Sequence, residues 1–369
     1  MTPEARVRAE AEAIFAAFQV AGARPVEAPV LLPAGTLLDL YGEDLRARAY
    51  VTADTPGDPA SEMMLRPDFT VPVVLAHMAH GADPARYCYR GAVFRRQDAP
   101  DAARPREYLQ VGYEVFDRDD PVAAEAEVFA LFARILAPLG LRAATGDIGL
   151  LTAAVAALDT TPGRRALLMR HIWRPGRFRA LLDRFAGRAP LPPARAALLD
   201  RLAGADIPAL VAAETHQGLR EPAEIAARAA ALVADAATPP LDARQVAAVD
   251  ALLALEGPAP EALATLRTLA AAMPALGPSV ARFADRLAAL GARGVDAGRL
   301  PFAAAMGQAS LEYYDGFVFA FRAADPALPP VASGGRYDAL TARLGEGRSI
   351  PAVGGVIRPG LVARLREGA

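Results

Sequence analysis

Three polar side chains on two predicted strands have the types and spacing to bind a small charged ligand. Arg95 ends an aromatic and β-branched segment (87–96), and Gln110 and Glu114 lie four residues apart in a second one (107–116). The intervening residues include two prolines and two aspartates, so we expect an antiparallel hairpin with a long loop. The loop region adds three guanidiniums, those of Arg96, Arg104 and Arg106. A carboxylate, an amide and several guanidiniums suit a zwitterion or a phosphate.

Side chains alternate between the two faces of a strand, and this alternation divides the segment 107–116. One face, which we expect to be packed, consists of Leu109, Val111, Tyr113 and Val115. The other face consists of Tyr108, Gln110, Gly112, Glu114 and Phe116. An amide and a carboxylate on either side of a glycine predict a shallow, polar floor for a ligand. The alternative interpretation is a surface hairpin whose charges are only solvated.

Helices and strands on both sides of the hairpin must position it. Thr2 is the predicted N-cap of an amphipathic helix that runs to about Val20 and is stopped by Gly22. A strand over 24–30 follows, and its prolines place it at an edge or a boundary. After the hairpin, the pattern predicts a helix over 121–139, with Asp120 as its N-cap and Gly140 after its end, and a strand over 141–148.

A second candidate part of the site precedes the hairpin. After a short strand over 49–52, an apolar strand ends at Arg66, and a helix is predicted over 71–80. Asp68 and Thr70 lie just before this helix, and either side chain is expected to cap its N-terminus.

The segment 149–300 differs from the rest because it is rich in alanine and leucine with helical periodicity. Proline and glycine pairs interrupt it, so we predict an all-helical insertion of several short helices. Residues 170–177 concentrate charge beside the only tryptophan. A solvated junction between two helices with a buried indole is the favoured interpretation, and a nucleic-acid or protein contact is the alternative.

The last segment returns to strand patterns. Strands are predicted over 311–321, 330–333 and 352–357. Gly334 and Gly335 are expected to open a helix, which is typical both of an anion site and of an ordinary tight turn.

The composition limits the classes of function. The chain has 369 residues and a formal net charge of −2, so it has no overall attraction to nucleic acid. It contains no lysine, which excludes Schiff-base chemistry on that side chain. Cys88 is the single cysteine and is expected to be a small core residue, so disulfides and a structural zinc site are not expected. Without a signal peptide or a long apolar segment, we expect a cytoplasmic protein.

Several motifs resemble one known family. The segments FRRQ and RPREYLQVGYEVF, together with LRPDFT, LEYYDGFVF and SGGRYDAL, are similar to motifs of histidyl-tRNA synthetases and their paralogues, which are class II aminoacyl-tRNA synthetases. VEAPVLLP resembles their first motif. The resemblance implies an α+β fold with an antiparallel sheet flanked by helices over 1–148 and 301–369. It also implies a helical insertion over 149–300, and because the chain ends soon after the third motif, no anticodon-binding domain.

The resemblance also implies roles for individual residues. In that family the position of Arg95 binds the α-phosphate of ATP. For a bound histidine, the resemblance assigns Asp68 and Thr70 to the ammonium group, and Arg95 and Gln110 to the carboxylate. The residues left for the imidazole are Glu114 and Tyr314, with Tyr313 beside them.

Three departures from the histidyl enzyme bear on catalysis. Ala309 replaces an arginine that acts at the activated carboxylate, and Leu361 replaces the arginine of the third motif, where Pro359 also breaks the pattern. Arg364 lies one turn further along and is a poor substitute. Gln97 stands where the enzyme has a glutamate. Losing one such charge-stabilising group costs about 3 kcal/mol, so adenylation is not expected.

A synthetase fold with a retained amino-acid pocket and an altered ATP site resembles the regulatory subunits of ATP phosphoribosyltransferase. This resemblance implies a non-catalytic protein, without a cofactor or metal, that serves the first step of histidine biosynthesis and its feedback inhibition by histidine. The implied partners are the short-form catalytic subunit, a second copy of this chain joined through 23–33, and histidine, but neither a membrane nor tRNA. The alternatives are an active histidyl-tRNA synthetase and a paralogue that modifies another protein.

Overall fold

The computed structural model describes residues 2–35, 46–53, 55, 61–99, 101, 103–214, 218–309 and 312–367. It has two compact units. The first consists of Met1–Leu151 and Leu252–Ala369, and the second of Thr152–Ala251. Among the described residues, no helix is long and apolar enough to span a membrane.

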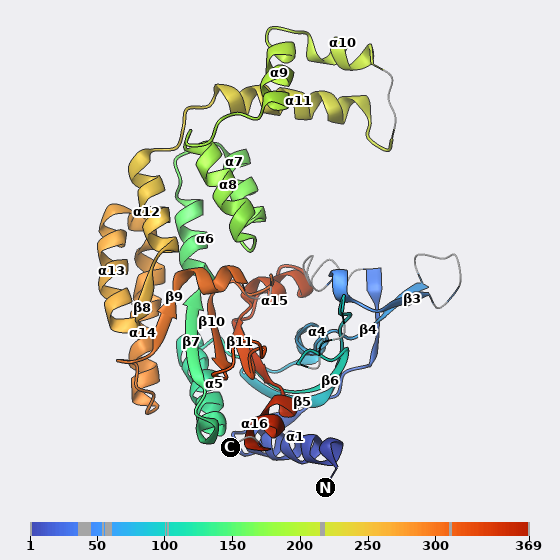
Figure 1. The fold of residues 1–369 in the computed structure, drawn as a ribbon, viewed down its shortest axis with the longest axis vertical. Helices are drawn as coiled ribbons and strands as arrows, with labels where there is room; N and C mark the ends of the chain where they lie inside the picture. The colour runs from blue at the N-terminus through green and yellow to red at the C-terminus, as the bar shows by residue number, and fades with distance from the viewer. Residues whose placement is uncertain are drawn as a thin grey trace. The chain divides into compact units, whose positions relative to one another are not determined.

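A nine-stranded mixed sheet forms the centre of the first unit (Figure 1). Its strands, in spatial order, are β1 (Arg24–Pro25), β5 (Ala85–Phe94), β6 (Glu107–Phe116), β12 (Ala352–Ile357), β11 (Ala332–Arg336), β10 (Phe317–Arg322), β7 (Arg142–Asp147), β9 (Pro301–Ala303) and β8 (Glu256–Pro258). The strands from β5 to β7 pair antiparallel, which confirms the predicted sheet. Near the edges β1 pairs with β5, and β7 with β9, in parallel.

The predicted hairpin is the β5–β6 pair, in which Tyr89 lies opposite Gly112 and Phe94 opposite Glu107. A backbone hydrogen bond from Arg95 N to Arg106 O, 2.8 Å long, extends the pairing beyond the strands. Burial differs from the prediction, because every residue of β6 from Gln110 onward is buried on both faces. The expected shallow floor is therefore an interior surface.

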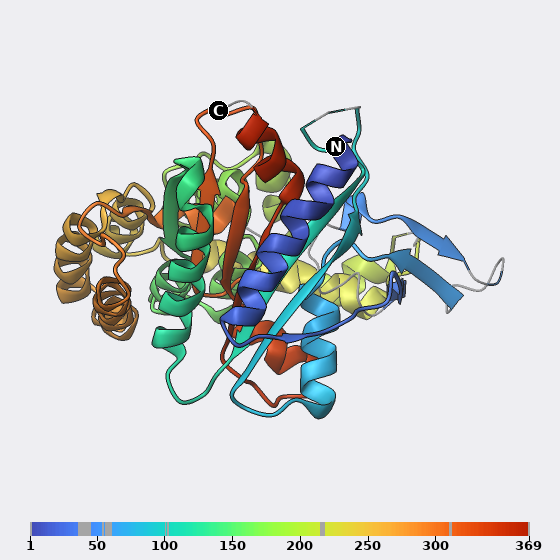
Figure 2. The same ribbon diagram turned by 90° about the horizontal axis from the view of Figure 1, so that it is seen from below.

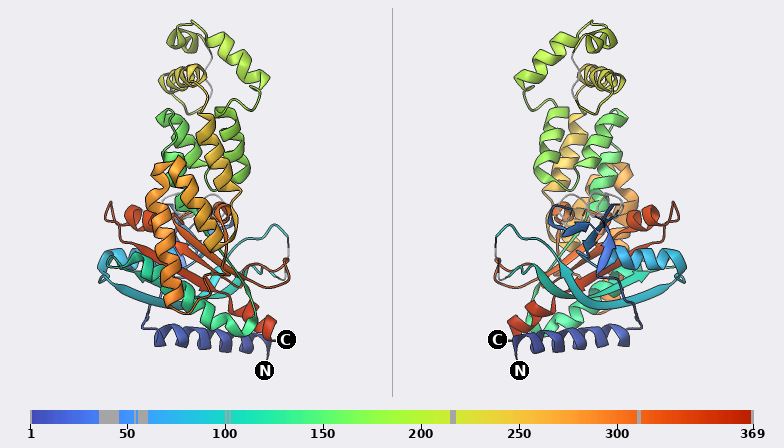
Figure 3. Two further views of the ribbon diagram at one scale, coloured as in Figure 1. Left: turned by 90° about the vertical axis from the view of Figure 1, so that its left-hand side faces the viewer. Right: turned by 90° about the vertical axis from the view of Figure 1, so that its right-hand side faces the viewer.

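Helices pack against this sheet. They are α1 (Pro3–Val20), α5 (Pro121–Leu136), α13 (Ala259–Ala272), α14 (Gly277–Ala292) and α16 (Pro359–Glu367). The Thr2 side chain caps α1 as predicted, and α1 lies beside α16 across the hairpin (Figure 2). Phe18 of α1 lies 5.2 Å from Tyr113 of β6 and 5.4 Å from Phe132 of α5, between ring centroids. These rings join α1 and α5 to one side of the sheet (Figure 3).

Two further helices and a small sheet complete the first unit. Helix α4 (Thr70–His80) contacts α15 (Asp338–Leu344). A separate antiparallel sheet has the order β2 (Leu31–Pro33), β4 (Glu62–Leu65) and β3 (Val51–Ala53). The predicted strand over 24–30 is wrong beyond its first two residues, since only Arg24–Pro25 is strand (β1), and β2, in the other sheet, begins at Leu31.

The last segment requires two corrections. The helix predicted to open over 334–338 is α15, which begins at Asp338. Gly334 and Gly335, however, do not form a turn before it; both lie within β11, where the backbone of β12 and the ring of Phe319 leave no room for a Cβ atom at Gly334. The strand predicted from Leu311 begins only at Phe317, and Leu311 itself lies outside the described residues.

The second unit is helical. It contains α7 (Pro162–Arg170), α8 (Pro175–Phe185), α9 (Pro193–Leu202), α10 (Ile207–Ala212) and α11 (Pro222–Ala237), with parts of α6 (Ile148–Ala156) and α12 (Ala243–Leu253). The buried Arg164 pairs with Asp235 at 2.6 Å and donates to the carbonyls of Thr238 and Pro239, which fixes the end of α11. This unit is shorter than the predicted insertion, because β8, α13 and α14 belong to the first unit.

Candidate functional site

Glu114 lies at the centre of a buried polar cluster in the first unit. Its Oε1 accepts hydrogen bonds from the hydroxyls of Tyr89 at 2.8 Å and Thr70 at 3.1 Å. Its Oε2 accepts one from Tyr337 at 2.6 Å. Side chains from three separate segments thus converge on one carboxylate.

Two glycines make this close packing possible. A Cβ atom at Gly354 would lie 1.5 Å from Oε2 of Glu114. At Gly112 it would lie 2.1 Å from the ring of Tyr89. Phe69 stacks on the other side of Tyr89 with ring centroids 4.4 Å apart. Because Gly112 and Gly354 have no side chains, there is room for the ring of Tyr89 and the carboxylate of Glu114.

Burial dominates the electrostatics of this cluster. It raises the pKa of Glu114 to about 7, although the hydrogen bonds from Tyr337, Tyr89 and Thr70 act in the opposite direction. Burial also raises the pKa values of Tyr89 and Tyr337, so both phenols stay protonated and can donate. The carboxyl group of Glu114 is therefore able to exchange a proton near neutral pH.

Asp68, Tyr313 and Tyr314 lie beside the same cluster, and Gln110 lies four residues before Glu114 on β6. Tyr313 donates to Oδ2 of Asp68 at 3.2 Å, and its ring is 4.9 Å from that of Tyr314. Gln110 is 1 % exposed, and its Oε1 has no hydrogen-bond partner among the described residues. A buried amide oxygen without a partner is unfavourable, so a donor from a ligand would stabilise it.

The predicted caps of α4 are wrong. Phe69 is the N-cap residue, and no side chain forms a capping hydrogen bond there. The reason is that Thr70 donates to Glu114 and Asp68 accepts from Tyr313, so both side chains belong to the polar cluster.

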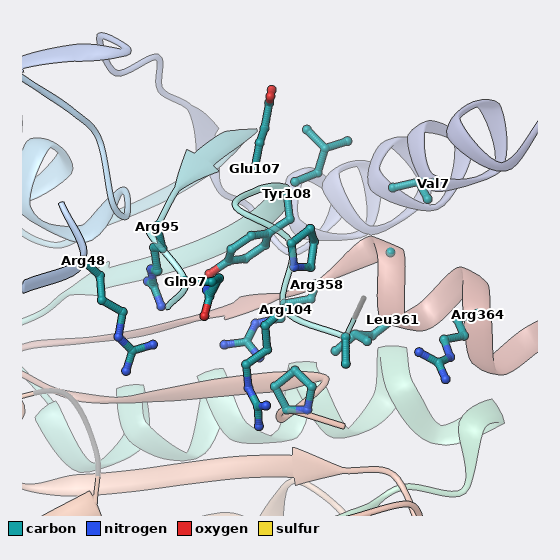
Figure 4. Close-up of a pocket in the computed structure, with 15 residues that line it drawn as sticks. Val7, Arg48, Arg95, Gln97, Arg104, Glu107, Tyr108, Arg358, Leu361 and Arg364 are labelled. Carbon is teal, nitrogen blue, oxygen red and sulfur yellow. The ribbon is translucent and has the colours of Figure 1, made fainter. Parts of the chain in front are cut away.

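A second feature, the arginine cavity, lies beside the loop end of the hairpin and has a volume of about 330 Å³ (Figure 4). Its charged lining consists of Arg48, Arg95, Arg104, Arg358, Arg364 and Glu107. The guanidinium carbon atoms of Arg95 and Arg358 lie 5.9 and 5.7 Å from the ring centroid of Tyr108. Arg95 thus belongs to the arginine cavity and also acts electrostatically on Tyr314.

The departures from the histidyl enzyme can be placed in part. Leu361 and Gln97 both line the arginine cavity. Ala309 is the last residue of a 3-10 turn, η4 (Ala304–Ala309). The cavity therefore has an apolar side chain, that of Leu361, in its lining.

Sequence reasoning missed residues of both features, including Arg48 of the arginine cavity. Tyr89 and Tyr337 were given no role, although both bind Glu114. Arg358 was not singled out, although it lines the arginine cavity. Tyr89 of β5 lies opposite Gly112 of β6. Because a glycine has no side chain, an aromatic ring on the neighbouring strand can lie over it, and this pairing is the feature that points to Tyr89. By contrast, Cys88 is buried as expected, and burial raises the pKa of its thiol to about 11.

Comparisons with known proteins identify the family. The family model described as Histidyl-tRNA synthetase matches residues 2–239 and 223–359. A protein of Mesorhizobium japonicum named ATP phosphoribosyltransferase regulatory subunit is 34% identical over 95% of this chain and 96% of its own length. A protein of the same name from Agrobacterium fabrum is 35% identical over 89% of each chain.

The fold has a solved counterpart. A Bacillus halodurans structure titled ATP phosphoribosyltransferase regulatory subunit/histidyl-tRNA synthetase matches with a TM-score of 0.67 and 18% identity, over 98% of this chain and 79% of that one. At this identity the match supports the class II synthetase fold alone. The sequence matches are closer and nearly full-length. The chain therefore belongs to the histidyl-tRNA synthetase family and, within it, to the ATP phosphoribosyltransferase regulatory subunits.

Proposed function

We propose that this protein is the non-catalytic subunit of an ATP phosphoribosyltransferase and that it supports the first step of histidine biosynthesis. The observation that carries this proposal is the nearly full-length similarity to regulatory subunits, 34% identical to one of them. Leu361 in the arginine cavity and Ala309 agree with it, because adenylation requires positive charge that these residues do not supply. The catalytic chemistry belongs to a separate short-form catalytic subunit.

The test of this function is reconstitution with that partner. Mixed with a short-form catalytic subunit from the same organism, the chain should form a larger complex on size exclusion and raise the rate of phosphoribosyl transfer. The protein alone should give no histidine-dependent exchange between ATP and pyrophosphate. A measurable exchange rate, or the absence of any complex between two folded proteins, would reject the assignment.

Histidine is the proposed feedback ligand, and the cluster around Glu114 is its proposed site. Gln110 supports this, since its buried Oε1 lacks a donor among the described residues and an N–H group of histidine, from the ammonium or the imidazole, can donate to it. Asp68, Thr70 and Arg95 supply charge and hydrogen bonds for the ammonium and carboxylate groups. Tyr313 donates to Asp68 at 3.2 Å, and its ring lies 4.9 Å from that of Tyr314.

The imidazole has to compete with hydroxyls that already bind Glu114. At 3.1 Å, the hydrogen bond from Thr70 is the longest of the three and the easiest to replace. Once Thr70 is released, Oε1 of Glu114 can accept from the imidazole. A few hydrogen bonds to charged groups, each worth about 1.5–3 kcal/mol, support micromolar affinity.

Calorimetric titration of histidine into wild type and Gln110→Leu tests the site. The variant should bind histidine at least tenfold more weakly, a change of about 1.4 kcal/mol. Its thermal stability should be unchanged, because the lost amide oxygen has no partner in the described structure. Gln19→Leu on the exposed side of α1 is the control and should bind like wild type. If histidine binds wild type and Gln110→Leu equally, its site lies elsewhere.

We also propose that two copies of the chain associate through the residues 23–33. The support is apolar exposure on and beside the small sheet: Val30, Leu31 and Val51 are 45%, 44% and 45% exposed. Apolar side chains gathered at the ends of short strands are typical of an interface.

A further inference from the structure

A groove with a volume of about 480 Å³ follows one side of α5 in the first unit. Helix α5 lies between α14 and α1 (Figure 2). Residues three and four apart share one side of a helix, so the residues of α5 that line the groove form a single row. We name it the α5 groove and define it by this row and by one residue after α14, that is, by Glu127, Ala130, Leu131, Arg134 and Arg293.

The α5 groove has two positive charges that no carboxylate neutralises. Its glutamate is already occupied, since Arg86 of β5 donates from Nε to Oε1 of Glu127 at 2.7 Å and from Nη2 to Oε2 at 2.8 Å. Arg134 and Arg293 are exposed, and in the part of the chain that the structure describes neither forms an ion pair. The charges of these two arginines are therefore available to a partner.

The two free arginines mark the ends of the α5 groove. Arg293 donates to the carbonyl oxygen of Ala123, in the first turn of α5, at 3.3 Å. Arg134 lies in the last turn of the same helix, about 16 Å further along at 1.5 Å per residue. A single small anion can neutralise one of these charges, whereas a partner that reaches both has to extend over several residues.

The surface between the arginines is apolar. Ala130 and Leu131 lie there, and Ala21 at the end of α1 also lines the groove. The residue before it, Val20, is 90% exposed, which is unusual for a valine in a helix. A protein segment with an apolar side chain would remove these side chains from water, which a small anion would not.

We propose that the α5 groove binds an acidic segment of the short-form catalytic subunit, with carboxylates at Arg134 and Arg293 and an apolar side chain over Leu131. The inference rests on the proposed function, which supplies this partner. Opposite charges at both ends of the groove fix the orientation of the segment and accelerate its association. A second copy of this chain is a poor fit, because a twofold axis through the groove would bring the same arginines face to face.

Reconstitution of the full chain with the catalytic subunit from the same organism tests this surface. In titration calorimetry, Arg134→Glu and Arg293→Glu should each weaken the complex at least tenfold, because attraction becomes repulsion. Arg267→Glu is the matched control and should bind like wild type, since Arg267 is an exposed arginine of α13 outside the groove. Thermal denaturation of each variant verifies that it is folded.

The salt dependence tests whether charge is what the groove recognises. Raising sodium chloride from about 50 to about 500 mM should weaken the wild-type complex more than the complex of either groove variant, because the variants have fewer attractive charges to screen. An equal salt dependence for wild type and the groove variants would contradict an acidic partner segment.

Light scattering on the chain alone distinguishes the catalytic subunit from a second copy as the partner. Arg134→Glu and Arg293→Glu should keep the oligomeric state of wild type. A changed state would overturn the proposal, since the groove would then join two copies of this chain. If wild type forms the complex and both variants bind as tightly, this surface is rejected and the proposed function stands. If wild type forms no complex, both are rejected.

Discussion

Glu114 is a carboxyl group that three hydroxyls bind in a fully buried position. Its pKa is about 7 in the folded chain against 4.5 for a free glutamate. A raised carboxyl pKa stabilises the fold at low pH, and this stability is lost as pH rises through about 7. Between about pH 5 and pH 8, wild type should lose about 2–3 kcal/mol of unfolding free energy relative to Glu114→Gln.

Urea denaturation of both proteins at the two pH values measures this difference. Glu127 provides a control with the opposite sign, since hydrogen bonds from Arg86 and Tyr113 outweigh the effect of burial and lower its pKa. The ionised Glu127 therefore stabilises the fold, and this stability is lost only as pH falls below the pKa of a free glutamate. The difference between wild type and Glu127→Gln should thus be nearly constant from about pH 5 to pH 8. Equal pH dependence for wild type and Glu114→Gln would contradict the raised pKa.

At the residue scale, the sequence predicts which polar side chains gather but not how they pair. Asp68, Thr70 and Glu114 do lie in one cluster. The cap expected for Thr70 follows from local rules, whereas its actual bond to Glu114 joins residues 44 positions apart. Such pairings depend on the register of β5, β6 and β12, which no local pattern specifies.

At the element scale, a buried network of charges joins α14 to the sheet. Arg286 of α14 donates to Oδ2 of Asp147 at 2.6 and 2.9 Å and lies 3.0 Å from Oε2 of Glu125 on α5. Arg336 of β11 pairs with the other oxygen of Glu125 at 2.9 Å. Asp147 ends β7 and accepts from the N–H of Gly149 in the first turn of α6. The network therefore fixes the helix that leads into the second unit.

Removing the central arginine should destabilise the first unit. Arg286→Leu leaves the carboxylates of Glu125 and Asp147 with fewer partners in a buried position, which costs about 3–5 kcal/mol. Arg282, one turn earlier on α14, is exposed, and Arg282→Leu should change stability by less than about 0.5 kcal/mol. Chemical denaturation of the two variants gives the comparison. A loss below about 1 kcal/mol for Arg286→Leu would mean that the network contributes little.

Helices whose first residues include a capping side chain and a proline could be predicted well from the sequence. Thr2 caps α1, and Asp120 caps α5 with Pro121 at its first position, as the sequence indicates. The errors fall where tertiary pairing decides the outcome. Gly334 and Gly335 have the chemistry of a turn but lie in β11, because neighbouring strands and Phe319 approach too closely for side chains.

At the scale of the whole molecule, the order of motifs predicted the fold, but the unit boundaries did not follow from composition. Residues 252–300 are as alanine-rich as the helices before them, yet α13 and α14 belong to the unit of the sheet. Helix α13 contacts β8, and α14 contacts α5. Phe283 of α14 lies 4.7 Å from Phe302 of β9, between ring centroids, and Arg286 pairs with Asp147 of β7. Contacts between elements far apart in sequence, rather than periodicity, define such a boundary.

The last prediction concerns self-association through the residues 23–33. Leu31→Glu should convert a homodimer into a monomer, since a charge in an apolar interface loses solvation without gaining a partner. Leu191→Glu in the second unit is a matched control, because Leu31 and Leu191 are both 44% exposed. Light scattering at micromolar concentration should therefore give a dimer for wild type and Leu191→Glu, and a monomer for Leu31→Glu. A folded monomeric wild type would contradict this interface, and so would a dimer that survives Leu31→Glu, since the glutamate would then lie in solvent.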